Sequence, residues 1–200
     1  MLSMPASRPY HHGDLRAALL KSAERTLREK GVAALSLREL ARDVGVSHAA
    51  PGRHFKDKQA LLDALALTGY ERLLRALGAA DAPERPIQER MTRLARAYLG
   101  FVIDNPALLE LMFARKHEPD TTGPLADAVE ETFGSLTHLV ADAQERGEIV
   151  PGDPERLMMV VASSLHGLAA LVAACALSPE EALAGLDEQV HHLLYGVAPR

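Results

Sequence analysis

The sequence predicts an all-helical protein, and three observations support this prediction. Apolar residues recur every three or four positions along most of the 200 residues, the spacing that lines one face of an α-helix. No segment alternates apolar and polar residues as a half-buried strand does. Residues that start or stop helices, such as Pro154 and Gly31, stand at the ends of the periodic segments. We expect about nine helices.

The stretch from Ser36 to Lys58 has the pattern of a helix-turn-helix. One face of its first helix is apolar, at Leu37, Leu40, Ala41 and Val44. Ser36 and Glu39 have the spacing of a capping box, which predicts a sharp start for this helix. Gly45 follows where the backbone must turn with positive φ, and Ser47 is placed to cap a second helix.

Proline and glycine positions divide the rest of the chain into further helices. We expect them over residues 13–30, 57–79, 87–104, 106–113, 124–146, 154–177 and 179–195. The proline-rich stretch 80–86 has no helical periodicity and predicts a domain boundary. An N-terminal three-helix head, residues 1–58, would then be joined to a C-terminal helical-bundle body, residues 80–200, by the helix that begins at the cap Asp57.

Charge is divided unevenly between these two parts. Residues 1–58 carry eleven Lys and Arg against six Asp and Glu, whereas residues 59–200 carry eleven against twenty-one. In the motif, Arg53, His54, Lys56 and Lys58 follow the second helix, and the helix 13–30 adds further basic side chains. Because a basic head neutralises phosphates and an acidic body repels them, this distribution favours nucleic-acid binding by the head.

Composition argues against a membrane-spanning or secreted protein. No apolar run reaches about 18 uninterrupted residues, and the nearest, 157–177, contains Ser163, Ser164, His166 and Gly167. The N-terminus has no apolar signal segment. The single cysteine excludes an intramolecular disulfide and fits a reducing cytoplasm, so we expect a cytoplasmic protein.

The sequence gives little support for a catalytic function. Cys175 lies between alanines, which favours a small apolar slot over a nucleophile. Adjacent histidines, His11 with His12 and His191 with His192, point about 100° apart on a helix, whereas helical metal ligands use a spacing of three or four. We therefore expect no enzyme, no bound metal and no cofactor, although an all-helical enzyme stays as a distant alternative.

Two segments resemble a known family. The segment LSLRELARDVGVSHAAPGRHFKDKQALLDAL resembles the DNA-binding region of TetR-type transcriptional repressors, and SSLHGLAAL from Ser163 resembles the Trp-His-Gly signature of one class of their C-terminal domains, with Leu165 in place of Trp. Many members carry Thr-Leu-Tyr where this chain has Ala50, Pro51 and Gly52. Because proline removes an intrahelical bond, the second helix of the motif is expected to start near Ala50.

The resemblance implies a homodimeric repressor that binds a palindromic operator in double-stranded DNA and is released by a small apolar or amphipathic inducer. The alternative is a ligand-sensing or carrier helical dimer with weak DNA affinity. In the motif we expect Ser47, His48 and Ala49 nearest base edges and Arg53, His54 and Lys58 near phosphates. The predicted DNA-binding residues are Ser36, Ser47, His48, Ala49, Arg53, His54 and Lys58.

A ligand site and a dimer interface are predicted in the body. Apolar residues and one histidine converge from four helices, with plain bundle core as the alternative for each: Phe101, Leu108, Met112, Phe113, Leu136, Met158, Met159 and His166. Two half-sites on DNA require a two-fold dimer. The last two helices carry apolar stripes for its interface: Val161, Leu165, Leu168, Val172, Leu183, Leu186, Val190, Leu193 and Leu194.

Overall fold

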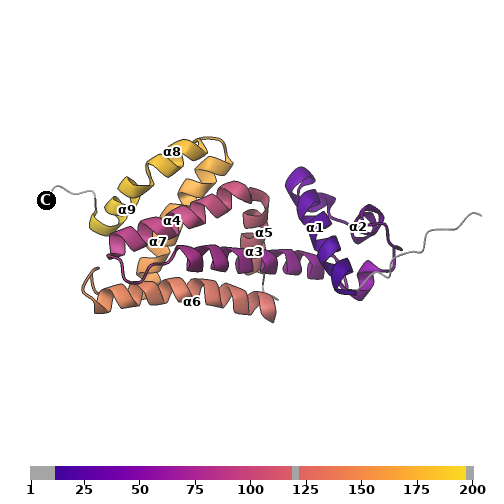
Figure 1. Ribbon diagram of the computed structural model, residues 1–200, viewed down its shortest axis with the longest axis horizontal. Helices are drawn as coiled ribbons and strands as arrows, with labels where there is room; N and C mark the ends of the chain where they lie inside the picture. The colour runs from indigo at the N-terminus through magenta and orange to yellow at the C-terminus, as the bar shows by residue number, and fades with distance from the viewer. Residues whose placement is uncertain (1–11, 119–121, 197–200) are drawn as a thin grey trace, which may run out of the picture.

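The computed structural model describes residues 12–118 and 122–196, and every regular element within them is helical (Figure 1). The α-helices are α1 (His12–Lys30), α2 (Leu37–Asp43), α3 (Lys58–Ala80), α4 (Ile87–Asp104), α5 (Pro106–Lys116), α6 (Pro124–Glu145), α7 (Pro154–Ala173), α8 (Pro179–Ala184) and α9 (Leu186–Tyr195). Two 3₁₀ turns, Val32–Ala34 and Pro51–Arg53, complete the described part. The predicted all-α class is confirmed.

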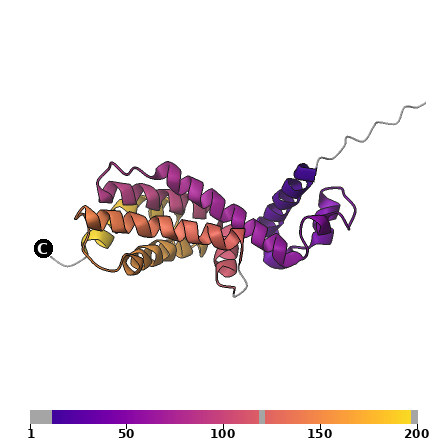
Figure 2. The same cartoon turned by 90° about the horizontal axis from the view of Figure 1, so that it is seen from below.

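The helix α3 joins two groups of helices. Figure 1 shows α1 and α2 at one end of the molecule and α4 to α9 around the rest of α3, and Figure 2 shows α6 running alongside α3. In the body, α3 packs on α4, α5 and α6. Its leucines Leu61, Leu65, Leu73 and Leu77 are all buried. The side chain of Asp57 accepts a hydrogen bond from the Ala60 N–H at 2.8 Å, so the predicted cap is confirmed.

The first helix also follows its pattern. Leu19, Ala23 and Leu27 are buried at a spacing of four residues, and α1 ends before Gly31, whose φ is 77°. A positive φ costs glycine no steric strain, which explains why the helix stops there.

Three expected boundaries differ from the structure. Helix α7 ends at Ala173, four residues early, because a turn with Cys175 at φ 55° satisfies its last carbonyl groups. Cys175 is consequently exposed and does not fill an apolar slot. The helix expected over 179–195 is divided at Gly185 into α8 and α9. Helix α5 continues to Lys116, where we expected a loop; residues 119–121 of that loop lie outside the described part.

By length and composition alone, α7 could cross a membrane, as could α4 and α5 if that pair, bent by 104°, formed one span. In the fold, α7 packs on α4 and α6 along one side.

Helices α3 and α5 pack closely at Gly69. A Cβ atom at this position would lie 2.5 Å from Sδ and 2.8 Å from Cγ of Met112, which is fully buried. The hydroxyl of the neighbouring Tyr70 donates a hydrogen bond to the carbonyl oxygen of Met112 at 3.3 Å. Glycine therefore permits α5 to rest directly on the connecting helix.

Replacing this glycine should destabilise the body. We expect Gly69→Ala to lower the free energy of unfolding by about 1–3 kcal/mol, because the added methyl group overpacks a buried contact. The matched control is Gly78→Ala in the same helix, where a Cβ meets nothing within 4 Å and should stabilise by about 0.5–1 kcal/mol. Urea unfolding measures both. Equal stability of the two variants would contradict the close packing at Gly69.

Candidate nucleic-acid interface and ligand site

The first helix of the motif begins at Ser36 without the predicted capping box. Ser36 has the extended backbone of a cap residue, but its side chain makes no capping hydrogen bond. Glu39 instead lies 3.6 Å from Arg42 on the same helix. The burial of Leu40 and Ala41 against the head holds α2 in place. Packing against the rest of the head, and not a capping hydrogen bond, therefore stabilises α2.

The turn after α2 is as predicted. Gly45 has φ 75°, and its N–H donates to the carbonyl oxygen of Arg42 at 3.2 Å. The N–H of Val46 donates to the carbonyl oxygen of Ala41 at 2.9 Å. These two bonds form the glycine-terminated ending that satisfies the last carbonyl groups of a helix.

The second helix of the motif is shorter than predicted. Ser47 does not cap an α-helix; its carbonyl oxygen accepts from the Ala50 N–H in a turn, and the 3₁₀ turn Pro51–Arg53 follows. Pro51 stands at the first position of this turn and Ala50 before it, as its missing N–H requires. The expected helix starting near Ala50 is therefore replaced by this 3₁₀ turn, and the described residues of the motif contain no regular recognition helix.

An exposed segment nevertheless collects most of the predicted DNA-binding residues. Ser47, His48 and Ala49 are exposed on the turn, and Arg53 and Lys58 are exposed beyond it. The ammonium of Lys58 lies 3.4 Å from the carbonyl oxygen of Ala33. We name residues 47–58 the recognition segment.

Two of the predicted DNA-binding residues are less exposed to solvent. Ser36 is half-buried at the start of α2, and His54 is half-buried with its Nε2 atom buried and without a hydrogen-bond partner in the described residues. The contact between His54 and a phosphate therefore stays a prediction. Sequence analysis missed Arg16, whose guanidinium lies 5.5 Å from the ring centroid of the buried Phe55.

The predicted ligand residues divide into three groups. Phe101, Leu108, Met112 and Met158 are buried in the body, while Phe113, Leu136 and His166 are half-buried. Met159 is 64% exposed on α7 and is corrected from a pocket residue to a surface residue. Adjacent residues on a helix point about 100° apart, which explains why Met158 and Met159 separate.

His166 and Phe113 do come together. Their rings stack with centroids 4.3 Å apart, and Nδ1 of His166 lies 3.1 Å from the hydroxyl of Tyr98. Burial raises the pKa of Tyr98 to about 12, so its hydroxyl stays protonated near neutral pH. Lys116 lies over the ring of Phe133, 3.4 Å from its centroid, and burial lowers the pKa of this lysine. Sequence analysis missed Tyr98, Phe133 and Lys116, which no short motif marks.

The predicted dimer residues also need correction. Leu186 and Val190 are fully buried within the one chain, in α9, which packs on α4. Their side chains have no surface left for a partner. The other seven, from Val161 to Leu194, are half-buried. The exposed apolar side chains of α7 are instead Met159, Val160 and Leu171, at 64%, 59% and 51%.

Comparison with known proteins agrees with this geometry. The family described as "Bacterial regulatory proteins, tetR family" matches residues 19–65, which contain the motif. The family described as "Tetracyclin repressor-like, C-terminal domain" matches residues 91–194, more than half of the chain. The chain therefore belongs to the TetR family. The resemblance found in the sequence is confirmed.

Individual relatives of this TetR-family chain give the same result. The HTH-type transcriptional regulator Rv1816 of Mycobacterium tuberculosis is 28% identical over 126 residues, 60% of this chain and 54% of that protein. The chain thus matches about half the length of this curated relative. A protein of unknown function from Rhodococcus sp. RHA1 is 40% identical, with a TM-score of 0.83 and coverage of 96% and 100%. A tetR-family regulatory protein from Rhodococcus RHA1 is 24% identical, with a TM-score of 0.75 and coverage of 92% and 98%, and shows the same fold.

No group of three His, Cys, Asp or Glu side chains that could hold a metal occurs in the described part of this TetR-family chain. His11 lies outside that part. The rings of His191 and His192 lie 5.7 Å apart at an interplanar angle of 73°. Because these residues are adjacent on α9, their two imidazoles do not point toward a common metal position.

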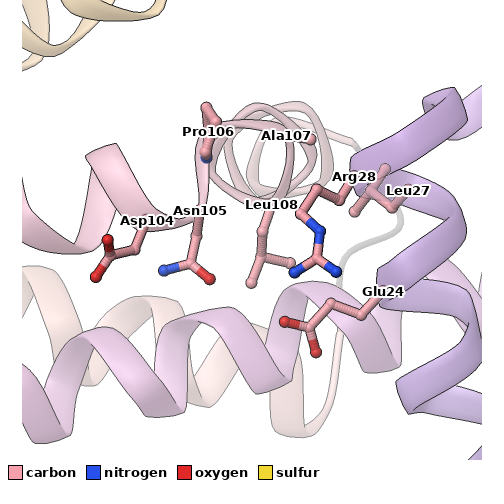
Figure 3. Close-up of a pocket in the computed structure, with 8 residues that line it drawn as sticks. All are labelled: Glu24, Leu27, Arg28, Asp104, Asn105, Pro106, Ala107 and Leu108. Carbon is pink, nitrogen blue, oxygen red and sulfur yellow. The ribbon is translucent and has the colours of Figure 1, made fainter.

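Ion pairs join the head to the connecting helix and the connecting helix to the body. Arg72 of α3 donates two hydrogen bonds to Glu24 of α1, at 2.5 and 2.7 Å. Figure 3 shows Glu24 and Arg28 facing the corner between α4 and α5, around Asn105. On the body side, Arg115 of α5 donates to Asp63 of α3 at 2.7 Å. The Glu24–Arg72 pair thus holds α1 on α3, and α1 also packs on α5, which is itself bonded to α3.

The Glu24 pair should make the stability of the head depend on pH. The hydrogen bonds from Arg72 hold the pKa of Glu24 below its ordinary value of 4.5. Its contribution is therefore complete above the unfolded-state pKa and is lost as the pH falls through the lower, folded-state pKa. We expect Glu24→Gln to lower the free energy of unfolding by about 1 kcal/mol at pH 7.

Urea unfolding at pH 7 and at pH 3 measures this contribution. The difference between wild type and Glu24→Gln should shrink at the lower pH. Glu29→Gln, an exposed position on the same helix, is the control and should change little at either pH. A pH-independent difference would show that Glu24 acts by packing and not by charge.

Proposed function

We propose that the protein is a sequence-specific DNA-binding transcriptional regulator, a homodimeric repressor released from a palindromic operator by a small apolar or amphipathic molecule. The exposed recognition segment, in a head that belongs to the TetR family, is the observation that most supports this proposal. The head, residues 1–58, would bind DNA, and the body, residues 80–200, would bind the ligand and the partner copy. Such a protein acts in the cytoplasm and catalyses no reaction.

DNA contact would come mainly from the exposed part of the recognition segment. Ser47, His48 and Ala49 are the candidates for base edges, and Arg53 and Lys58 for phosphates. With few polar groups available for base edges, phosphate contacts would supply most of the affinity. The excess of basic over acidic residues in the head supports a DNA affinity that comes mainly from phosphate contacts.

The partner copy would cover the exposed face of α7. Met159, Val160, Ser163, Gly167, Ala170 and Leu171 are all exposed there, at the three- and four-residue spacing of one helical face. Apolar and small side chains in such a row permit close packing of two helices across a two-fold axis. A dimer would hold two recognition segments about 34–36 Å apart, as one turn of DNA requires.

A ligand in the body would act on DNA through α3 and α5. Both helices link the body to the head, α3 directly and α5 by its contacts with α1 and α3. A shift of α5 at Met112 is transmitted to Gly69, because no space separates the two. A coupling of about 1–3 kcal/mol would weaken operator binding about 5- to 150-fold.

Salt dependence tests the DNA contacts. Each phosphate contact contributes about 0.9 to the slope of log affinity against log salt, so Lys58→Ala should reduce the slope by about one per protomer. Arg75→Ala, at an exposed basic residue in the second half of α3, should leave the slope unchanged. Fluorescence anisotropy with operator DNA at several salt concentrations measures both. An unchanged slope for Lys58→Ala would remove this lysine from the interface.

Substitution on α7 tests the dimer. Leu171→Glu should yield folded monomers that bind the operator weakly, because a carboxylate would be buried without a partner in the two-fold contact. Leu186→Glu, at a fully buried position, should instead lose the folded body. Light scattering with circular dichroism separates the two outcomes. A Leu171→Glu variant that stays dimeric would place the interface on another face.

A further inference from the structure

Arg16 of α1 lies against the end of the recognition segment. Its guanidinium carbon is 5.5 Å from the ring centroid of Phe55, within the distance of about 6 Å at which a cation and an aromatic face attract each other. Arg16 is exposed to solvent, whereas Phe55 is only 2% exposed and belongs to the buried core. Figure 1 shows α1 and the segment that precedes α3 together at the end of the molecule remote from the body.

The ring of Phe55 is held in one place beside this arginine. The N–H of Phe55 donates a hydrogen bond to the carbonyl oxygen of Pro51 at 2.9 Å, and Pro51 is itself buried. Because core packing and this bond hold the ring, the guanidinium that stacks on it is restrained as well. A restrained side chain loses less conformational freedom when it binds a further group.

The stacked arginine keeps its hydrogen-bonding edge for another ligand. Stacking uses the face of a guanidinium and leaves the N–H groups along its edge available. Among the residues that the structure describes, Arg16 makes no ion pair and no hydrogen bond besides its contact with Phe55. Two parallel N–H groups of a guanidinium match two oxygens of a phosphate. The chemistry at this position therefore suits a phosphate.

Other exposed cations belong to the same segment. They stand on either side of Phe55 in the sequence: Arg53, Lys56 and Lys58. The one acid among them, Asp57, is engaged in capping α3. The stacking on Phe55 brings a fourth cation, from α1, to this group. Like charges gathered in one region repel one another, and a row of phosphates relieves that repulsion.

We propose that Arg16 is a phosphate-binding residue of the head, and that Phe55 is the positioning residue that holds its guanidinium ready for the DNA backbone. The contact extends DNA binding from the recognition segment to α1. It adds affinity without base specificity, because the phosphates are alike at every step of a duplex. This inference rests on the proposed DNA-binding function and adds one contact to it.

Binding to a mixed-sequence DNA duplex at several salt concentrations tests the contact, because phosphate contacts do not depend on sequence. Arg16→Ala should reduce the slope of log affinity against log salt by about 0.9 per protomer and weaken binding at low salt about three- to tenfold. Lys21→Ala is the matched control. It removes one positive charge from an exposed position of α1, about 140° around the helix from Arg16, and should change the slope far less. Equal slopes for wild type and Arg16→Ala would overturn the proposal.

Two further variants test the role of the ring. Arg16→Lys keeps the charge, so the salt slope should stay near that of the wild type while the affinity falls, because an ammonium does not pair with two phosphate oxygens at once. In a Phe55→Leu protein, with its fold checked by circular dichroism, Arg16→Ala should weaken binding only about twofold or less. Wild-type affinity of Arg16→Lys, or an undiminished effect of Arg16→Ala beside Leu at position 55, would overturn the positioning by the ring.

Urea unfolding and the Lys58→Ala variant show which idea has failed if the slope does not change. A lower free energy of unfolding for Arg16→Ala with an unchanged slope would mean that Arg16 only stabilises the head, which would overturn the proposal. A reduced slope for Lys58→Ala alone would overturn this inference and leave the proposed function standing. Absence of DNA binding by the wild type would overturn both.

Discussion

The structure depends on one helix along which a single hydrophobic core continues from the head into the body. Helix α3 has 23 residues, about 35 Å at 1.5 Å per residue, and its first turns pack on the head while the rest pack on the body. The head alone is small, so much of its apolar surface is buried against this helix. The charge-assisted hydrogen bonds from Arg72 of α3 to Glu24 of α1 add to this contact. The orientation of the recognition segment therefore depends on the contacts that hold α3 in place.

Gly69 is the point at which the body acts most directly on this helix. Close-packed contacts transmit displacement because they have no empty space to absorb it. Met112 touches α3 at Gly69 without a gap, and three residues later Arg115 of the same helix bonds to Asp63. Helix α5 therefore contacts the connecting helix along most of its own length. A ligand that moved α5 would turn α3 as well.

Periodicity and capping predicted most of this architecture, because both depend on residues near one another in the chain. The cap at Asp57, the stop at Gly31 and the helix 87–104 were local features and were confirmed. Burial of individual side chains was harder to predict. An apolar stripe on α9 has the same pattern whether it faces its own core or a partner, so Leu186 and Val190 were assigned to the wrong surface. The cluster of Tyr98, Phe113 and Lys116 depends on contacts between helices that no spacing records.

The recognition segment departs from a regular helix, and this local departure changes how the protein would bind DNA. Pro51 and Gly52 replace the residues that would extend a helix, and the observed 3₁₀ turn leaves Ser47 to Ala49 in an exposed turn. The turn is nevertheless ordered in the free protein, because the Ser47 carbonyl oxygen accepts from the Ala50 N–H and Pro51 is buried. The buried Phe55 also holds the end of the segment on the head. Specific contacts would then be formed on the operator, while phosphate attraction, which needs no fixed helix, brings the protein to DNA.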